Sequence, residues 1–467
     1  MNYNNYSTIL EKKLEKNIEG IVRIFKNKTK LTINSKIEGA YLRALSVSAL
    51  NSETLLKLHK DFYLKSIKKN YYFSSYELFL LGKIFCKKFN IKTNIKISKI
   101  KIVFNFFKSI LKIIYWSIII KINFLKKNHK KNKNYFFFIN LKDKSKLEFK
   151  NFINLRFMEI DKIFLFKNSS DNVFKKIMQF KYNIFKYRNY FEINFKYLAF
   201  RESLLKLSPN KILFIEGDSA DHELISEISK NLNTKTYSFQ WGAFVNRNIK
   251  FGFKKMSHNY FLAWSNSYSN ILKKYNKFTK FISVGSPLIK KIKPRDKILF
   301  LMHPQTSFVS EEENYQLYDL LKQISKKFKN KVIVRYHPKS KDRFDLPNTI
   351  EHDPNKISLI KSLEHSFCCV SVRTSSILEA ARIGVIPVLL RKNYKVYEDN
   401  ILLLKNINSS SLIFDDNINA LQFITKLSNN KTLRNKFSKS LITKYVYAIK
   451  FIGNRSKHQI RRKIQLL

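Results

Sequence analysis

One stretch of the sequence combines hydroxyl groups, a cation and a carboxylate at helical spacing. It runs from residue 372 to 390, reads VRTSSILEAARIGVIPVLL, and contains the hydroxyl residues Thr374, Ser375 and Ser376. Serine and threonine are preferred at helix N-caps, and a helix N-terminus presents free N–H groups and a positive dipole to an anion. Arg373 adds charge, and Glu379, one turn further, can accept hydrogen bonds from ribose hydroxyls. The stretch predicts a site for a sugar-linked phosphate, and the alternative is an ordinary capped helix.

Two His-Pro pairs stand at the ends of apolar runs. His303 follows KILFLM, and His337-Pro338 follows KVIVRY, in which Arg335 lies two residues before the histidine. A histidine at the carboxyl end of a strand can donate a hydrogen bond to a phosphate oxygen and can protonate a leaving phosphate. These four residues are predicted to bind the donor substrate, with His337 also catalytic. The alternative is that both histidines are packed or surface residues.

Two carboxylates, Glu216 and Asp218, follow another apolar run in LFIEGDSADHE. Closely spaced carboxylates at a strand end suit a general base for an acceptor hydroxyl, and their repulsion can raise one pKa. Acids at a helix N-terminus that complement its dipole are an equal alternative. In the next run, SFQWG, the residues Gln240, Trp241 and Gly242 are predicted to contact the acceptor, where Trp241 either stacks on a sugar ring or fills the core.

Short apolar runs must carry these motifs as β-strands. The first series comprises 134–140, 162–167, 211–217, 236–242, 260–265 and 280–287, and the second comprises 297–304, 331–338, 367–372 and 385–390. Strands that alternate with helix-length segments are typical of βαβ units and parallel sheets. We therefore predict an α/β fold with two successive Rossmann-like domains, and ligands normally bind at the carboxyl ends of such strands.

The chain also has a helical N-terminal region. All eight prolines lie between Pro209 and Pro387, and apolar residues before 130 recur at helical spacing. The predicted domains are a helical region over 1–130, a first Rossmann-like domain over 131–290 and a second over 291–467. The segment SPLIKKIKPRDK, residues 286–297, is interpreted as the linker between the last two.

A predicted helix over 101–125 is strongly apolar and is followed by the basic run from Lys126 to Lys133. Three lysines interrupt its apolar residues, so it lacks the ~20 consecutive apolar residues of a membrane span. One hypothesis is an interfacial helix that lies on an anionic membrane surface. The alternative is a helix packed on the protein, because amphipathicity alone does not distinguish lipid from protein.

The composition limits which partners, metal sites and cellular locations the protein can have. The 467 residues carry a formal charge of +55, which suits anionic partners, but no RNA-binding motif accompanies it. We therefore expect no specific nucleic-acid partner. The three cysteines, Cys86, Cys368 and Cys369, form no disulfide framework, and no Cys/His spacing indicates zinc. The polar start MNYNNYSTILEKKLEKN lacks the apolar stretch of a signal peptide, so we expect a cytoplasmic protein.

The order of the motifs resembles that of a known family. E-G-D at a strand end, Q-x-G, VGSP, H-P and TSS..EA…G..PV together resemble GT-B glycosyltransferases of the bacterial capsule and surface-polysaccharide type, over about residues 210–390. Bacterial sialyltransferases, polysialyltransferases and capsular Kdo transferases use similar HP and serine motifs. Teichoic-acid polyol-phosphate transferases share these elements, but Trp241-Gly242 stands where they often have His-Gly. E-G-D also departs from the two acids and glycine of the family.

The resemblance implies a base at Glu216 or Asp218, donor binding and leaving-group protonation by His337, and phosphate contacts from Ser375 and Ser376. It also implies a GT-B fold, in which the first Rossmann-like domain binds the acceptor and the second the nucleotide sugar. The expected protein is a metal-independent glycosyltransferase without a cofactor. It would transfer a sugar from a nucleotide donor, with CMP as the first expectation, to a surface polysaccharide or lipid-linked glycan at the inner membrane face.

Three other functions stay open. One is a transferase of polyol phosphate from a CDP-linked donor, and another is a non-catalytic binding protein that keeps a GT-B fold. A two-domain epimerase that releases free sugar is the third.

Overall fold

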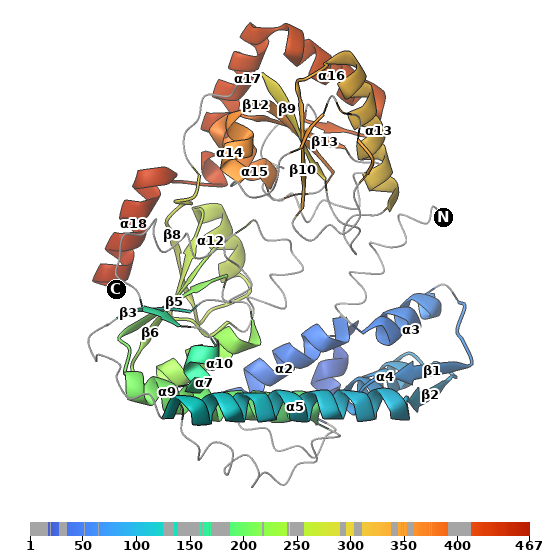
Figure 1. Cartoon of the computed structure of the whole chain (residues 1–467), viewed down its shortest axis with the longest axis vertical. Coiled ribbons are helices and arrows are strands. Elements are labelled where there is room, and N and C mark those ends of the chain that lie inside the picture. Colours follow the sequence, from blue (N-terminus) through green and yellow to red (C-terminus); the bar gives the residue numbers. More distant parts are fainter. Residues whose placement is uncertain are drawn as a thin grey trace.

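A computed structural model of the chain shows two α/β units and a helical N-terminal region (Figure 1). The residues that it describes are 17–18, 20–27, 35–50, 52–63, 65–124, 135–138, 158–160, 162–167, 169, 187–216, 219–240, 242, 256–289, 296–302, 311–337, 344–346, 348, 350–352, 359–372, 374, 376–390 and 412–467. All statements below concern these residues.

The second α/β unit is built on a six-stranded parallel sheet with the strand order β11-β10-β9-β12-β13-β14. Its central strands are buried along their whole length, because helices cover both faces of such a sheet. The strands are β9 (Lys297–Met302), β10 (Val332–Tyr336), β11 (Glu351–His352), β12 (Ser366–Ser371), β13 (Ile386–Leu390) and β14 (Ile413–Phe414). The helices are α13 (Glu311–Lys327), α14 (Leu359–Glu364), α15 (Ser376–Ile383), α16 (Asn417–Asn429) and α17 (Lys431–Lys444).

The first α/β unit has a second parallel sheet, in the order β4-β3-β5-β6-β7-β8. Its strands are β3 (Tyr135–Phe138), β4 (Met158–Ile160), β5 (Lys211–Ile215), β6 (Lys235–Phe239), β7 (Tyr260–Ala263) and β8 (Lys280–Ser283). Its helices are α7 (Lys162–Lys167), α9 (Arg188–Leu207), α10 (Ala220–Lys230) and α12 (Asn266–Lys273). The predicted α/β fold with two Rossmann-like domains is thereby confirmed.

The N-terminal region is mainly helical, as predicted, and also contains a small sheet. Its helices are α2 (Ser35–Leu50), α3 (Glu53–Tyr63), α4 (Tyr76–Lys88) and α5 (Lys99–Phe124), and the strands β1 (Asn70–Phe73) and β2 (Asn94–Ile97) pair in parallel. This region shares one apolar core with β3, β5, α9 and α10. It is therefore a layer of the first α/β unit, with no separate core of its own.

The end of the chain returns to the first unit. After the 3₁₀ turn η4 (Tyr445–Tyr447), helix α18 (Gly453–Leu466) lies beside the first sheet (Figure 1). Ile452 forms a parallel bridge with Ser286, and the Ser456 hydroxyl donates to the carbonyl of Val284 at 2.8 Å. Lys211 donates to main-chain carbonyls of α18. The predicted second domain, 291–467, thus contains a final helix that packs on the first.

Nine of the ten predicted strand segments contain a strand, and one prediction was wrong. Residues 162–167 form helix α7, whose Leu165 and Phe166 are fully buried. The Phe166 ring stacks on Trp116 with a centroid distance of 4.7 Å. A six-residue apolar run fits a buried helix turn as well as a strand, so periodicity did not separate the two. The three cysteines are buried, and all are free, in agreement with the predicted lack of a disulfide framework.

Candidate functional site

The hydroxyl-rich stretch forms a strand-to-helix turn at the carboxyl end of β12. The Thr374 hydroxyl oxygen accepts a hydrogen bond from the backbone N–H of Ser376, the first residue of α15, at 3.2 Å. Gly384, with φ +89°, ends this helix in the left-handed conformation that glycine adopts freely. The predicted capped helix is therefore present, with its N-terminus at the strand edge where α/β proteins bind ligands.

Glu379 lies in the first turn of α15, and its carboxyl is closely surrounded by protein although part of the residue remains accessible. This burial raises the pKa of Glu379 from 4.5 to about 7. The carboxyl is close enough to Tyr268, on α12 of the first unit, to raise the pKa of that phenol. The start of α15 in the second unit therefore lies near the start of α12 in the first, and each helix begins after the carboxyl end of a strand.

Three tyrosines, from α12 and η4, lie near the start of these helices. Burial raises the pKa of Tyr268 well above its usual value, and the neighbouring Tyr447 raises it further. Tyr445 and Tyr447, from η4, have ring centroids 6.0 Å apart, and burial raises the pKa of both. These three residues were not predicted from the sequence. No local pattern marks them, because α12 and η4 are distant in the sequence and meet only through the return of the chain.

His337 and Arg335 lie at the carboxyl end of β10. The His337 backbone N–H donates to the carbonyl of Met302 at the end of β9, at 2.9 Å, and the residue is exposed. The Arg335 guanidinium donates to the Ser362 hydroxyl of α14 at 2.8 Å. His337 is thus displayed at the same strand edge as α15, whereas Arg335 is engaged with a neighbouring helix.

Glu216 follows β5 and has a strained backbone. Its φ of +64° lies in the left-handed region, which is uncommon for residues other than glycine. Its backbone N–H donates to the carbonyl of Phe239 at the end of β6, at 2.8 Å. Residues held in such conformations cluster at functional sites, so the strain supports Glu216 as a candidate base.

Gln240, at the end of β6, is completely buried. Its amide nitrogen donates to the carbonyl of Gly242 at 2.9 Å, and its amide oxygen accepts the backbone N–H of Trp264 at 2.8 Å. The side chain predicted to contact an acceptor is therefore bonded within the protein, where it fixes the strand end before Gly242.

Several predicted site residues lie outside the described part of the chain. These are Asp218, Trp241, His303, Pro338, Arg373 and Ser375. Their predicted roles stay predictions. Of the predicted set, the structure brings Thr374, Ser376, Glu379 and His337 to the carboxyl edge of the second sheet, and Glu216 and Gln240 to that of the first.

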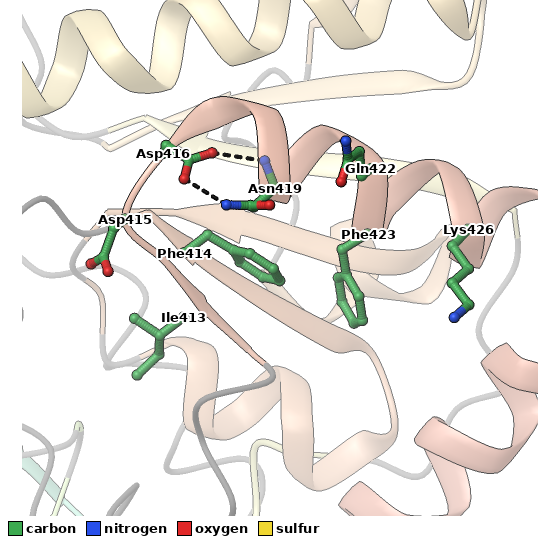
Figure 2. Close-up of a pocket in the computed structure, with 8 residues that line it drawn as sticks. All are labelled: Ile413, Phe414, Asp415, Asp416, Asn419, Gln422, Phe423 and Lys426. Atoms are coloured by element: carbon green, nitrogen blue, oxygen red, sulfur yellow. Dashed lines mark hydrogen bonds between the residues drawn. The ribbon is translucent and has the colours of Figure 1, made fainter.

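Two hollows occur elsewhere among the described residues. One, of about 470 Å³, lies along β14 and α16, where Asp416 accepts hydrogen bonds from the backbone and side chain of Asn419 (Figure 2). Another, of about 340 Å³, lies between α17 and the start of β13. Neither contains a predicted site residue. Within the described ranges, no cluster of three or more His, Cys, Asp or Glu side chains could hold a metal ion.

Comparison with known proteins yields weak structural similarities. The wall teichoic acid polymerase TagF is 10% identical over 79% of this chain and 98% of its own, with a TM-score of 0.45. The UDP-N-acetylglucosamine 2-epimerase of Rickettsia bellii is 16% identical over 74% and 91%, with a TM-score of 0.42. The glycosyltransferase of kitacinnamycin is 11% identical over 57% and 79%, with a TM-score of 0.36.

No protein-family model matches the chain, and no curated protein does. Similarities this weak identify neither a reaction nor a substrate. What is established is the architecture seen in the chain itself, two Rossmann-like α/β units with six-stranded parallel sheets.

Proposed function

We propose that this chain is a GT-B glycosyltransferase that transfers a sugar from a nucleotide donor. The observation that carries the proposal is the start of α15 at the carboxyl end of β12, with Glu379 in its first turn and near Tyr268 of the first unit. In α/β proteins this edge binds ligands, and a helix N-terminus there favours a phosphate.

In the proposed mechanism, the N-terminus of α15 binds the donor diphosphate or monophosphate, with Thr374 and Ser376 beside it. Glu379 accepts a hydrogen bond from a ribose hydroxyl, and the exposed His337 side chain hydrogen-bonds the leaving phosphate and protonates it. Glu216, or Asp218, removes the proton from the acceptor hydroxyl. The helix dipole, the imidazole and nearby cations would offset the charge of the leaving group, so we propose a reaction without a metal ion or cofactor.

The finer identity rests on the motif resemblance alone. We propose a CMP-linked sugar as donor and a surface polysaccharide or lipid-linked glycan as acceptor. A polyol phosphate carried by CDP would use the same phosphate and ribose contacts, and the mass of the product separates the two: a sugar residue is added in one case and a phosphodiester-linked polyol in the other.

Nucleotide-dependent stabilisation is the direct test. We would measure thermal unfolding with CMP, CDP, UMP, UDP, GDP and ADP, since a ligand at 100 times its Kd adds about 2.7 kcal/mol of stability. The expected result is stabilisation by one base only, which Thr374→Ala abolishes.

The matched control is Asn430→Ala. Asn430 caps α17 by accepting the backbone N–H of Leu433 at 2.8 Å, away from the proposed site. Its loss should cost about 1 kcal/mol of stability and leave the nucleotide effect intact. If no nucleotide stabilises the wild type, or if both variants lose the effect equally, the stretch after β12 is only a capped helix and the proposal fails.

A further inference from the structure

Helix α5 turns its apolar face away from the protein. Its exposed large residues are Ile100, Val103, Phe104, Phe107, Leu111, Ile114, Tyr115 and Ile118. Ile100 is 84% exposed, Phe104 68% and Leu111 64%. At 3.6 residues per turn these positions fall within an arc of about 120°, and at 1.5 Å per residue they extend over about 27 Å. We call these eight residues the outer stripe. Figure 1 shows α5 along one edge of the molecule, with α2 and α4 on its inner side.

The opposite face fastens α5 to the first unit. Trp116 is 4% exposed and stacks on Phe166 and Phe195, and Ile113 is buried beside it. The Asn105 amide donates to the carbonyl of Ser74 at 2.9 Å. Lys112 forms an ion pair with Glu192 of α9 at 2.6 Å. A surface helix normally points its apolar face inward, so this orientation is the reverse of the usual one.

Lysines line both sides of the outer stripe. Lys99 lies on one side, about 100° from its centre, and Lys101 and Lys108 lie at similar angles on the other. All three are exposed, and α5 contains no Asp or Glu. The sequence after α5 continues with a basic run from Lys126 to Lys133. An apolar stripe with one lysine on one side and two on the other matches the apolar interior and anionic headgroups of a lipid surface.

We propose that the outer stripe docks this protein on the surface of an anionic lipid bilayer, with α5 parallel to the membrane plane. A second copy of the chain fits less well, because α5 contains no Asp or Glu that could pair with the flanking lysines of the other copy. Among the described residues, Lys99–Ile119 is also long and apolar enough to cross a membrane. Crossing would, however, remove Trp116 and Ile113 from the core and break the Lys112–Glu192 pair.

The test uses the full-length chain and vesicles of phosphatidylcholine, with and without phosphatidylglycerol, in a flotation assay. Deleting α5 would also remove core residues, so we would substitute only the outer stripe: Phe104→Ser, Phe107→Ser and Leu111→Ser together. The control is Leu205→Ser with Phe278→Ser, which are 46% and 87% exposed on other parts of the unit. A second variant changes Lys99, Lys101 and Lys108 to Gln.

We expect the wild type to float with the anionic vesicles and to be released by high salt. The triple serine variant should bind at least tenfold more weakly, whereas the control pair should bind as the wild type does. Each lysine removed should weaken binding roughly fivefold at low salt. A thermal unfolding temperature equal to that of the wild type would show that the triple serine variant and the lysine variant fold.

Four results would overturn the proposal. The first two are a wild type that does not bind anionic vesicles and a triple serine variant that binds them as the wild type does. The third is wild-type protein that stays in the membrane during alkaline extraction, as a protein with a spanning helix does. The fourth is a wild-type dimer that becomes a monomer in the triple serine variant while vesicle binding stays the same. Because vesicle binding is read without any nucleotide, its failure leaves the proposed transferase reaction untouched.

Discussion

Replacing Glu379 by glutamine tests the electrostatics of the candidate site. The pKa of Glu379 rises from 4.5 to about 7 because its carboxyl is removed from water. At 1.36 kcal/mol per pH unit, the charged form costs at most about 3 kcal/mol of stability, an upper limit because part of the residue is accessible. A carboxyl whose pKa is raised in the folded state holds its proton more tightly there than in the unfolded chain. Its contribution to stability is therefore full below pH 4.5 and is lost as the pH rises through 7.

Glutamine stays neutral at every pH, so Glu379→Gln should match the wild type near pH 4.5 and exceed it by up to about 3 kcal/mol at pH 8. The assay is thermal or urea unfolding of both proteins between pH 4.5 and pH 8. The same variant should bind the preferred nucleotide about tenfold to a hundredfold more weakly at pH 8, because it loses a charged acceptor for a ribose hydroxyl.

Glu77→Gln is the matched control. Burial raises the pKa of Glu77 to about 7 as well, but this carboxylate lies in the N-terminal region, where it accepts hydrogen bonds from Tyr41 at 3.1 Å and from the Asn189 amide at 2.7 Å. The stability of Glu77→Gln relative to the wild type should also rise with pH. At pH 4.5 this variant should already be less stable than the wild type, because glutamine cannot accept hydrogen bonds from both Tyr41 and Asn189 as the carboxylate does. Nucleotide binding should not change. A stability difference for Glu379→Gln that is independent of pH would refute the reasoning.

Three further predictions concern single positions. Gly285→Ala should cost several kcal/mol in urea unfolding, because φ is +78° and the new Cβ would lie 2.0 Å from a backbone carbonyl oxygen, whereas Gly453→Ala, with φ +54° and its nearest neighbour at 3.7 Å, should cost only about 1 kcal/mol. Lys196→Met should cost about 3–5 kcal/mol, since it leaves Asp221, now paired at 2.8 Å, without its buried cation; a loss below 1 kcal/mol would show that water already screens the pair. His337→Ala should lower sugar transfer at least a hundredfold with unchanged circular dichroism, and near-normal turnover would exclude the histidine from the mechanism.

Local patterns predicted those features of the fold that depend on local chemistry. Apolar runs such as KILFI and FCCVS are buried in the middle of parallel sheets, and continuous apolar runs of this length are typical of such strands. Gly384 ends its helix where the sequence requires a left-handed residue. The run 162–167 was misassigned because its two buried residues, Leu165 and Phe166, satisfy a helix turn equally well.

Contacts between distant segments were not predictable in this way. Gln240 was predicted to contact the acceptor, but its side chain is engaged by Trp264, whose backbone N–H donates to it from the end of the neighbouring strand. Glu379 was identified from its spacing, whereas its neighbour Tyr268 lies on α12 of the other unit. The direction in which α5 faces also depends on partners, since only Phe166 and Phe195 show that Trp116 points inward.

The return of α18 to the first unit has a mechanical consequence. The chain passes between the two units twice, once after β8 and once before α18, and the two passages lie side by side where Ser286 pairs with Ile452. A single connection would let the units swivel about any axis, whereas two adjacent connections leave rotation about one axis as the easy motion. The Tyr268–Glu379 junction lies close to this paired segment, because Tyr447 neighbours Tyr268 and the Lys450 backbone N–H donates to the carbonyl of Trp264 at 2.9 Å. Rotation about the paired segment would therefore move the junction little and would change the separation of the strand edges farther from it. The entry and release of a ligand between those edges would then depend on the rotation of the two units. The two paired connections together would set the axis of that rotation.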